Sequence, residues 1–142
     1  MNKLERLKKI CQKYNIALAY LFGSQKENAL RILENKNASI NDPLADIDVG
    51  IVFSCDIENV KERYKLYGDI YNELEELFKP YPLDLVFLQE SHSVFQVEAL
   101  KGICVYSVSE EFKDNYEMMV LRRAADFKYV LEKYIEEALE KY

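Results

Sequence analysis

The sequence has no tryptophan, a single histidine and few residues that interrupt regular structure. Four glycines and three prolines in 142 residues exclude a collagen-like chain or a flexible linker. One histidine, His92, argues against a His-based zinc site or a Ser–His–Asp triad, and we expect it at the surface near a helix cap. The chemistry of this protein is therefore expected to depend on carboxylates.

Cysteine and long apolar runs are also scarce. Cys11, Cys55 and Cys104 form no CxxC pair, and any disulfide would leave one of them over, so reduced, mostly buried thiols are expected. No apolar run reaches the roughly 18–20 residues that span a bilayer, and the first ten residues lack the apolar core of a secretory signal. These absences predict a cytoplasmic protein without a membrane partner.

The charge balance is acidic, with 19 Lys and Arg against 25 Asp and Glu and a net charge of −6. Nucleic-acid binders usually present a basic surface, so this balance disfavours nucleic acid as a partner. Hydrophobic residues make up 49% and charged residues 31%, which is typical of a globular chain. The length suits one domain with an appended helix.

Hydrophobic periodicity predicts alternating helices and strands. The expected helices cover residues 3–14, part of 25–45, 57–79, 91–101 and the chain from about 110, and the expected strands cover 16–22, 46–53, 83–88 and 103–107. This order predicts an α+β (α/β) domain with a small mixed β-sheet flanked by helices and a long C-terminal helix. We place the domain at residues 1–107, with 25–45 as an inserted helix and loop, and the C-terminal helix at 108–142.

Asp46 and Asp48 flank one residue at the start of a predicted strand. The two-residue period of a strand puts both carboxylates on one face, where they repel unless a hard cation such as Mg²⁺ lies between them. If the strand at 83–88 lies beside this one, Asp84 can complete a three-oxygen site. The alternative is that Asp46 and Asp48 are solvated strand-start residues and Asp84 is a turn residue.

Gly23 and Ser24 follow a buried strand and open the next segment. Such a turn can present backbone N–H groups and a hydroxyl to a phosphate, although Gly-Ser is also an ordinary turn with an ordinary helix cap. A phosphate-binding turn beside a carboxylate metal site suits metal-assisted nucleotidyl transfer, in which two Mg²⁺ ions hold the triphosphate and activate the attacking hydroxyl.

At these motifs the sequence resembles the minimal nucleotidyltransferases of the polymerase-β-like superfamily. The resemblance rests on LFGS at 21–24, ADIDVGIVF at 45–53 and LDLVFL at 83–88. It continues through FQVEALKGICVYS at 95–107 and NYEMMVLRRAADFKYVLEKY at 115–134, which are similar to the MntA-type antitoxins. The resemblance thus covers nearly the whole chain and implies the polymerase-β-like nucleotidyltransferase fold.

The resemblance also implies an activity. MntA-like proteins pair with HEPN-domain ribonuclease toxins, and active members transfer AMP from ATP to a tyrosine of the toxin. Carried over by motif, Gly23 and Ser24 would hold the phosphates of the nucleotide. Asp46 and Asp48 would bind Mg²⁺, and Asp84 would be the third carboxylate, able to help deprotonate the acceptor hydroxyl.

The sequence departs from the family pattern in two ways. Residues 25–45 form a longer segment between Gly-Ser and the Asp pair than the family usually has, and QKEN replaces the Arg-Gly that many members carry after Gly-Ser. Lys26, Arg31 or Lys36 can supply the missing positive charge. The alternatives are a catalytically weak antitoxin that neutralises the toxin by binding, or a nucleotidyltransferase for a small hydroxylated substrate.

The C-terminal helix has an apolar stripe that allows two roles. It can pack on its own domain, or it can present the stripe to another chain. We expect the first as the main role, with part of the helix contributing to a homodimer or to a hetero-oligomer with the toxin.

Overall fold

The computed structural model describes residues 2–42 and 44–140. Its helices are α1 (Lys3–Lys13), α2 (Lys26–Leu33), α3 (Arg63–Phe78), α4 (Ser93–Leu100) and α5 (Glu110–Glu140). Its strands are β1 (Ile16–Phe22), β2 (Ile47–Phe53), β3 (Leu83–Phe87) and β4 (Ile103–Ser107), and two short 3-10 turns lie at Ile57–Asn59 and Leu88–Glu90. The predicted α+β architecture is confirmed.

The four strands form one mixed sheet in the order β3-β2-β1-β4. β1 pairs antiparallel with both β2 and β4, while β2 and β3 run parallel. All seven residues of β1 are buried, as expected for a central strand whose two faces are both covered. The sheet therefore holds the ends of β1, β2 and β3 in a fixed register.

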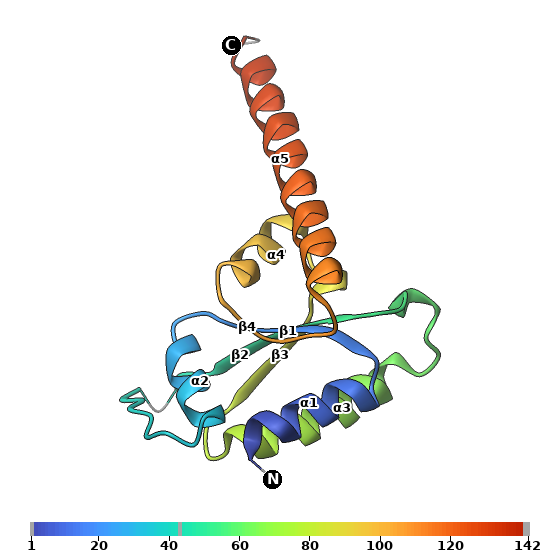
Figure 1. The fold of residues 1–142 in the computed structure, drawn as a ribbon. Helices are drawn as coiled ribbons and strands as arrows, with labels where there is room; N and C mark the ends of the chain where they lie inside the picture. The colour runs from blue at the N-terminus through green and yellow to red at the C-terminus, as the bar shows by residue number, and fades with distance from the viewer. Residues whose placement is uncertain (1, 43, 141–142) are drawn as a thin grey trace.

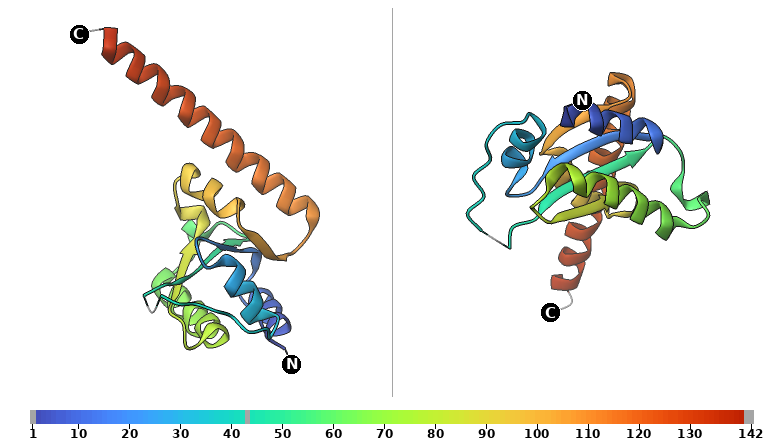
Figure 2. Two further views of the ribbon diagram at one scale, coloured as in Figure 1. Left: turned by 90° about the vertical axis from the view of Figure 1, so that its left-hand side faces the viewer. Right: turned by 90° about the horizontal axis from the view of Figure 1, so that it is seen from below.

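Helices lie on both faces of the sheet (Figures 1 and 2). α1 and α3 lie side by side on one face, where Ile70, Leu74 and Leu77 join the larger apolar core with the inward side chains of β2. On the opposite face, a smaller core contains Tyr20, Val52 and residues of α4 and α5. We call these the α1/α3 face and the α4/α5 face.

The helix predicted over 57–79 begins at Arg63 in the structure. Asp56 instead caps a 3-10 turn by accepting a hydrogen bond from the backbone N–H of Glu58 at 3.0 Å. Glu62 then adopts a left-handed conformation with φ 57°, which no α-helix can continue through. The helix must therefore restart after Glu62.

Hydrogen bonds between buried side chains fix the first turns of α5 to the domain. The hydroxyl of Tyr116 donates to Gln96 Oε1 of α4 at 2.5 Å, and Gln96 Nε2 donates to the carbonyl of Ser91 at 2.8 Å. The hydroxyl of Tyr20 in β1 donates to Glu117 at 2.9 Å. Beyond these turns α5 projects away from the domain (Figure 2).

The structure also shows where the three cysteines lie and whether any helix could cross a membrane. The three cysteines are free thiols, but the expectation that they are mostly buried is wrong, since Cys11 is buried, Cys104 is half-buried and Cys55 is exposed. Burial raises the pKa of the Cys11 thiol to about 12, so this thiol stays protonated and unreactive near neutral pH. In residues 2–42 and 44–140 no helix is long and apolar enough to cross a membrane.

Candidate functional site

The sheet brings two of the three predicted carboxylates into adjacent positions. Asp48 of β2 is paired with Asp84 of β3 in the parallel ladder, and on its other side Asp48 is paired with Phe22 of β1. Asp46 lies directly before β2 and is exposed. Because side chains alternate along a strand, Asp48 and Asp84 share the α4/α5 face, and the condition set in the sequence analysis, that the two strands are neighbours, is met.

The environment of Asp48 disfavours its ionised form. Burial raises the pKa of this carboxyl to about 6, and the charge of Asp84, a hydrogen bond to Asp84 and the charge of Asp46 add to the rise. Three carboxyl groups thus act on one another at the end of the sheet. Such a concentration of negative potential attracts a cation.

Gly23 brings the chain after β1 against this carboxyl group. Its φ is +77°, in the left-handed region that glycine adopts readily. A Cβ atom at this position would overlap Oδ2 of Asp48 and would lie 3.2 Å from its Cγ. Only glycine therefore allows the backbone of the Gly23-Ser24 turn to approach Asp48 so closely, and this contact places the turn beside the carboxylates.

The Gly-Ser turn leads directly into α2, which begins at Lys26. The side chain of Gln25 does not cap this helix, and the Lys26 N–H donates to the Gly23 carbonyl at 3.4 Å. The N–H groups of Glu27 and Asn28 are therefore the ones that can serve an anion. Ser24 is exposed at the same end of the helix. The structure therefore places the N-terminus of α2 close to the carboxylates, and the phosphate-binding role of Gly23 and Ser24 stays a prediction.

The three cations of the inserted segment differ in their surroundings. Arg31 donates to the carbonyl of Asn37 at 2.7 Å, and Lys36 lies 3.8 Å from Glu34. Lys26 stands in the first turn of α2, next to the Gly-Ser turn, and forms no ion pair within the described chain. Of the three, Lys26 is best placed to compensate for the missing arginine.

Two aromatic residues of the α4/α5 face escaped the sequence analysis. Phe95 of α4 packs edge-on against Phe22, with ring centroids 5.8 Å apart, and 41% of Phe95 remains exposed. Because Phe22 is the neighbour of Asp48 in the sheet, Phe95 provides an apolar surface near the carboxylates. Its place in an apolar helix, VFQVEAL, gave no signal of this, since the contact depends on how α4 crosses the sheet.

The single histidine has a structural role. Nδ1 of His92 accepts a hydrogen bond from the backbone N–H of Val94 at 3.2 Å and so caps α4. Its ring also contacts Phe127 of α5, with centroids 4.5 Å apart. The predicted cap-region placement of His92 is confirmed.

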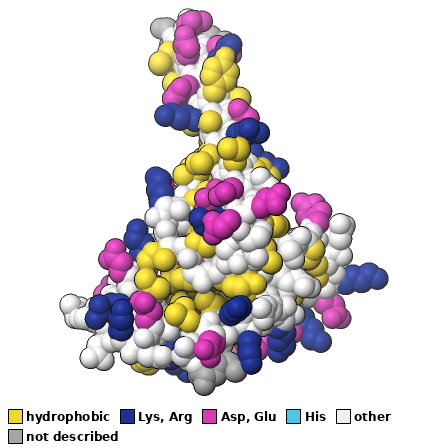
Figure 3. All heavy atoms as spheres, viewed as in Figure 1, with side chains coloured by type: hydrophobic (Ala, Val, Ile, Leu, Met, Phe, Trp, Pro, Cys, Tyr) yellow, Lys and Arg dark blue, Asp and Glu magenta, His cyan; other side chains and the backbone are white. Residues whose placement is uncertain are grey.

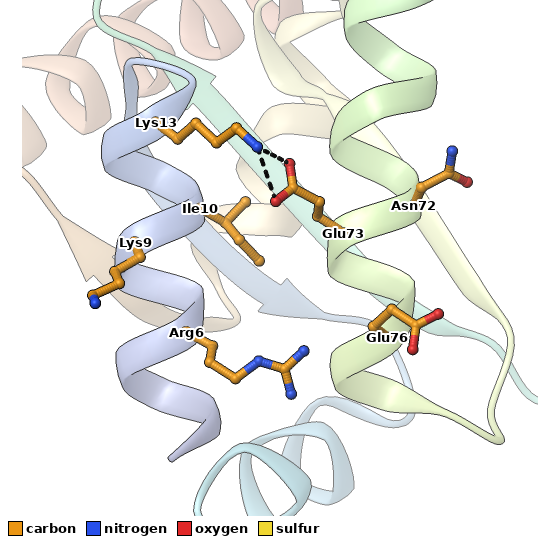
Figure 4. Close-up of a pocket in the computed structure, with 7 residues that line it drawn as sticks. All are labelled: Arg6, Lys9, Ile10, Lys13, Asn72, Glu73 and Glu76. Atoms are coloured by element: carbon orange, nitrogen blue, oxygen red, sulfur yellow. Dashed lines mark hydrogen bonds and ion pairs between the residues drawn. The ribbon is translucent and has the colours of Figure 1, made fainter. Parts of the chain in front are cut away.

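A hollow of about 350 Å³ between α1 and α3 lies on the other face of the sheet (Figure 4). Of its charged side chains, Lys13 and Glu73 point toward each other and pair at 3.1 Å, while Lys9 points away from the hollow (Figure 4). Tyr14 also donates to Glu73, which lowers the pKa of that carboxyl. Since this hollow lies on the face of the sheet opposite to the Asp48–Asp84 pair and the Gly-Ser turn, it is not the candidate site.

The carboxylates do not form a ready-made metal cage. Among residues 2–42 and 44–140, no three His, Cys, Asp or Glu side chains converge closely enough to hold an ion by themselves. Mg²⁺ commonly binds through one or two carboxylates together with the phosphates of a substrate and water. The pair of Asp48 and Asp84 beside the Gly-Ser turn fits that kind of shared site.

Known proteins of similar structure include a toxin–antitoxin with AMP-PNP, which is 15% identical with a TM-score of 0.64 over 98% of this chain and 99% of the other. An MntA–HepT toxin–antitoxin matches with 15% identity and a TM-score of 0.60 over 96% and 97% of the two chains. A structure from Shewanella oneidensis matches with 14% identity and a TM-score of 0.60 over 98% and 99%. These likenesses show a shared fold that includes α5.

The comparison with curated proteins gives no match. The sequence family described as Polymerase beta, Nucleotidyltransferase matches residues 5–111, from α1 to the start of α5. This range contains the Gly-Ser turn and all three aspartates, and it agrees with the resemblance found in the motifs. The chain belongs to the polymerase beta nucleotidyltransferase family.

Proposed function

We propose that this protein transfers AMP from ATP to a tyrosine hydroxyl of a HEPN-domain ribonuclease toxin, with Mg²⁺ as cofactor, and so acts as an antitoxin. The observation that carries the proposal is the close approach of Gly23 to Asp48, with Asp84 on the neighbouring strand. It puts a phosphate-binding turn and two carboxylates at one end of the sheet. The fold shared with MntA–HepT structures supports a toxin as the acceptor.

The carboxylates of the three aspartates would bind Mg²⁺. Asp46 and Asp48 would hold Mg²⁺, and Asp84 would share it, because the charges of Asp84 and Asp46 add to the effect of burial in raising the pKa of Asp48. When bound, Mg²⁺ supplies charge neutralisation at the phosphates and activation of the acceptor hydroxyl. Two ions would match the number of carboxylate and phosphate oxygens gathered there.

The Gly-Ser turn and α2 are assigned to the phosphates. The backbone N–H groups after Gly23 and the Ser24 hydroxyl would donate to phosphate oxygens, and the positive end of α2 favours the same charge. Lys26 would provide the positively charged side chain that an arginine supplies in many members of the family. These groups orient the triphosphate so that pyrophosphate is the leaving group.

The transfer step needs a base for the acceptor hydroxyl. Asp84 is exposed and would accept the tyrosine proton as the tyrosine oxygen attacks the α-phosphorus of ATP. A bond forms between that oxygen and the α-phosphorus, and the bond from the α-phosphorus to the bridging oxygen breaks. The products are an AMP–tyrosine ester and pyrophosphate, and the proton remains on Asp84 until solvent removes it.

Intact-mass spectrometry of a candidate HEPN toxin after incubation with this protein, ATP and Mg²⁺ tests the proposal. We expect the toxin to gain the mass of one or more AMP groups. The gain should disappear with the double variant Asp46→Asn/Asp48→Asn and persist with Asp69→Asn, which removes an exposed carboxylate of α3 on the far face.

Two other outcomes would change the assignment. A stable complex without any mass gain would favour an antitoxin that acts by binding alone, and deletion within residues 25–45 would then test whether the insertion blocks transfer. Neither a complex nor a mass gain would redirect the search to small hydroxylated acceptors. Transfer that survives the double aspartate variant would contradict the assigned metal ligands.

A further inference from the structure

Most of α5 lies outside the domain it begins on. Of its residues Glu110–Glu140, only Tyr116 and Val120 are buried. Large apolar side chains beyond them are open to solvent, with Tyr134 69% and Leu139 71% exposed. Figure 3 shows hydrophobic side chains along this projecting helix between charged ones. A long helix that exposes this much apolar surface to solvent indicates that another protein chain binds to it.

The apolar residues of the bare part follow the repeat of a coiled coil. Ala124, Phe127, Leu131, Tyr134 and Ala138 are separated by alternating steps of three and four residues. This spacing keeps one seam facing a second helix along the whole projecting length. Phe127 and Leu131 are 41% and 44% exposed, so the seam is accessible even where α4 lies nearby.

The charged residues beside the seam favour a second α5 helix as the partner and an antiparallel orientation of the two helices. Arg123 and Glu137 each directly precede a seam alanine, and neither forms an ion pair in the described part of the chain. In an antiparallel pair of identical helices, residues of this position face each other, so Arg123 meets Glu137 twice. A parallel pair would instead bring Arg123 against Lys128, which repels it.

The part of α5 that lies beside α4, which we call its root, borders a groove that can accept the C-terminal part, or tip, of another α5 helix. α4 and α5 enclose an open groove of about 340 Å³, whose lining is mainly apolar. The lining residues are Val94, Val97, Glu98, Ala124, Phe127, Lys128 and Leu131. Near the tip, the seam residue Tyr134 and its neighbour Ile135 stand among glutamates, so these side chains fit the groove while the glutamates approach Arg123 and Lys128 at the root of the other copy.

We propose that α5 pairs antiparallel with α5 of a second copy of this chain. The twofold axis passes near Val130, Phe127 packs on Leu131 of the other copy, and Arg123 pairs with Glu137 at both ends. This is a self-complementary interface of the kind found in twofold dimers. It goes beyond the proposed catalytic function and holds whether or not the chain transfers AMP.

Sedimentation of the full-length protein tests the interface through charge reversal. We expect a concentration-dependent dimer, whose dissociation constant rises about tenfold or more in Arg123→Glu or Glu137→Arg, because each creates two like-charge pairs. The double variant Arg123→Glu/Glu137→Arg should restore the dimer. The matched controls Arg122→Glu and Glu136→Arg change the same charges on the outward side of the helix and should dimerise like the unmodified chain.

A cysteine variant tests the direction of pairing. In a Cys55→Ser background, which removes the exposed thiol, Val130→Cys should form an intermolecular disulfide under mild oxidation, because this position meets itself only in the antiparallel pair. Tyr129→Cys, on the outward side, should not. An unmodified chain that is monomeric at high concentration, or whose α5 is covered only when a toxin is added, would overturn the proposal.

Discussion

The two faces of the sheet differ in how completely helices cover them. On the α1/α3 face, the inward side chains of β2 and β3 are closed off by α3, whose Ile70, Leu74 and Leu77 are fully buried. On the α4/α5 face, the core is smaller, Phe95 is half-exposed, and Asp48 and Asp84 stand where helices leave the strand ends uncovered. The first face is built for stability, whereas the second leaves room for ligands and partners.

The difference follows from the two-residue period of β2. Its alternate residues Ile47, Val49, Ile51 and Phe53 face the larger core, while Asp48, Gly50 and Val52 face the other side. Charge at Asp48 costs stability because the carboxyl is half-buried beside Asp84. The proposed binding of Mg²⁺ would give a reason for this cost, since active sites commonly trade stability for function.

The largest effect on stability is expected on the closed face. Leu74→Ala should lower the free energy of unfolding by about 2–5 kcal/mol, because it leaves a cavity in a fully buried site. Urea unfolding followed by circular dichroism measures the change. Transfer activity per folded molecule should stay the same, and a loss of activity in the folded fraction would contradict the separation of the two faces.

Gly23→Ala should affect stability and activity together. The new Cβ would overlap Asp48 Oδ2 and would sit on a residue with φ +77°, so we expect a loss of about 1–3 kcal/mol. AMP transfer should fall more than the unfolded fraction explains, because the Gly-Ser turn must move away from the carboxylates. Gly68→Ala is the matched control, since a Cβ there meets nothing within 4 Å.

On the α4/α5 face, Tyr116→Phe removes the hydroxyl that donates to Gln96 at 2.5 Å. The buried Oε1 of Gln96 would lose its donor, which costs about 1–2 kcal/mol. The effect should be smaller than that of Leu74→Ala because no cavity forms. Thermal unfolding measures it, and a variant as stable as the unmodified chain would show that water replaces the hydroxyl.

The pH dependence of stability should reveal the strain at Asp48. The folded pKa of its carboxyl is raised to about 6 from 3.8, so the folded state favours the protonated form. Stability from this group is present below pH 4 and is lost as the pH rises through 6. Relative to the unmodified chain, Asp48→Asn should therefore gain about 1 kcal/mol between pH 4 and 7, after discounting for solvent screening.

Urea unfolding in a chelator across this pH range measures the gain. Asp69→Asn should show no comparable pH-dependent gain, since Asp69 is exposed on α3. Mg²⁺ should stabilise the unmodified chain more than Asp48→Asn, because the cation relieves repulsion that the variant has already removed. A difference that stays constant from pH 4 to 7 would contradict the raised pKa of Asp48.

The sequence was sufficient to predict the strands, because alternation in DIDVGIVF identifies the two faces of β2. The sheet order β3-β2-β1-β4, which pairs Asp48 with Asp84, came from the structure. The sequence could not predict the break at Glu62, where a left-handed residue interrupts an apolar pattern that continues on both sides. Nor could it locate Phe95 beside Phe22, which depends on packing between distant elements. The assigned roles of Gly23, Ser24 and the aspartates stay predictions.

The C-terminal helix shows the limit of periodicity most clearly. A stripe of apolar residues predicts that one side of a helix is covered, but it does not distinguish the chain's own domain from another chain. In the structure only Tyr116 and Val120 of α5 are buried, and beyond them Phe127 still contacts His92 at the start of α4 while remaining partly exposed. A Leu→Ala substitution in each helix compares how much a leucine side chain of α5 and one of α3 contribute to the free energy of unfolding.

Leu139→Ala should therefore change the stability of the monomer by less than about 0.5 kcal/mol, because 71% of the side chain is already exposed. The same change in Leu74 is expected to cost several times more. Unfolding must be measured at low protein concentration, since a dimer through α5 would add a concentration-dependent contribution. At high concentration the gap between the two variants should stay as wide, because Leu139 directly follows the seam residue Ala138 and lies on the outward side of the paired helices, while Leu74 is buried in either state.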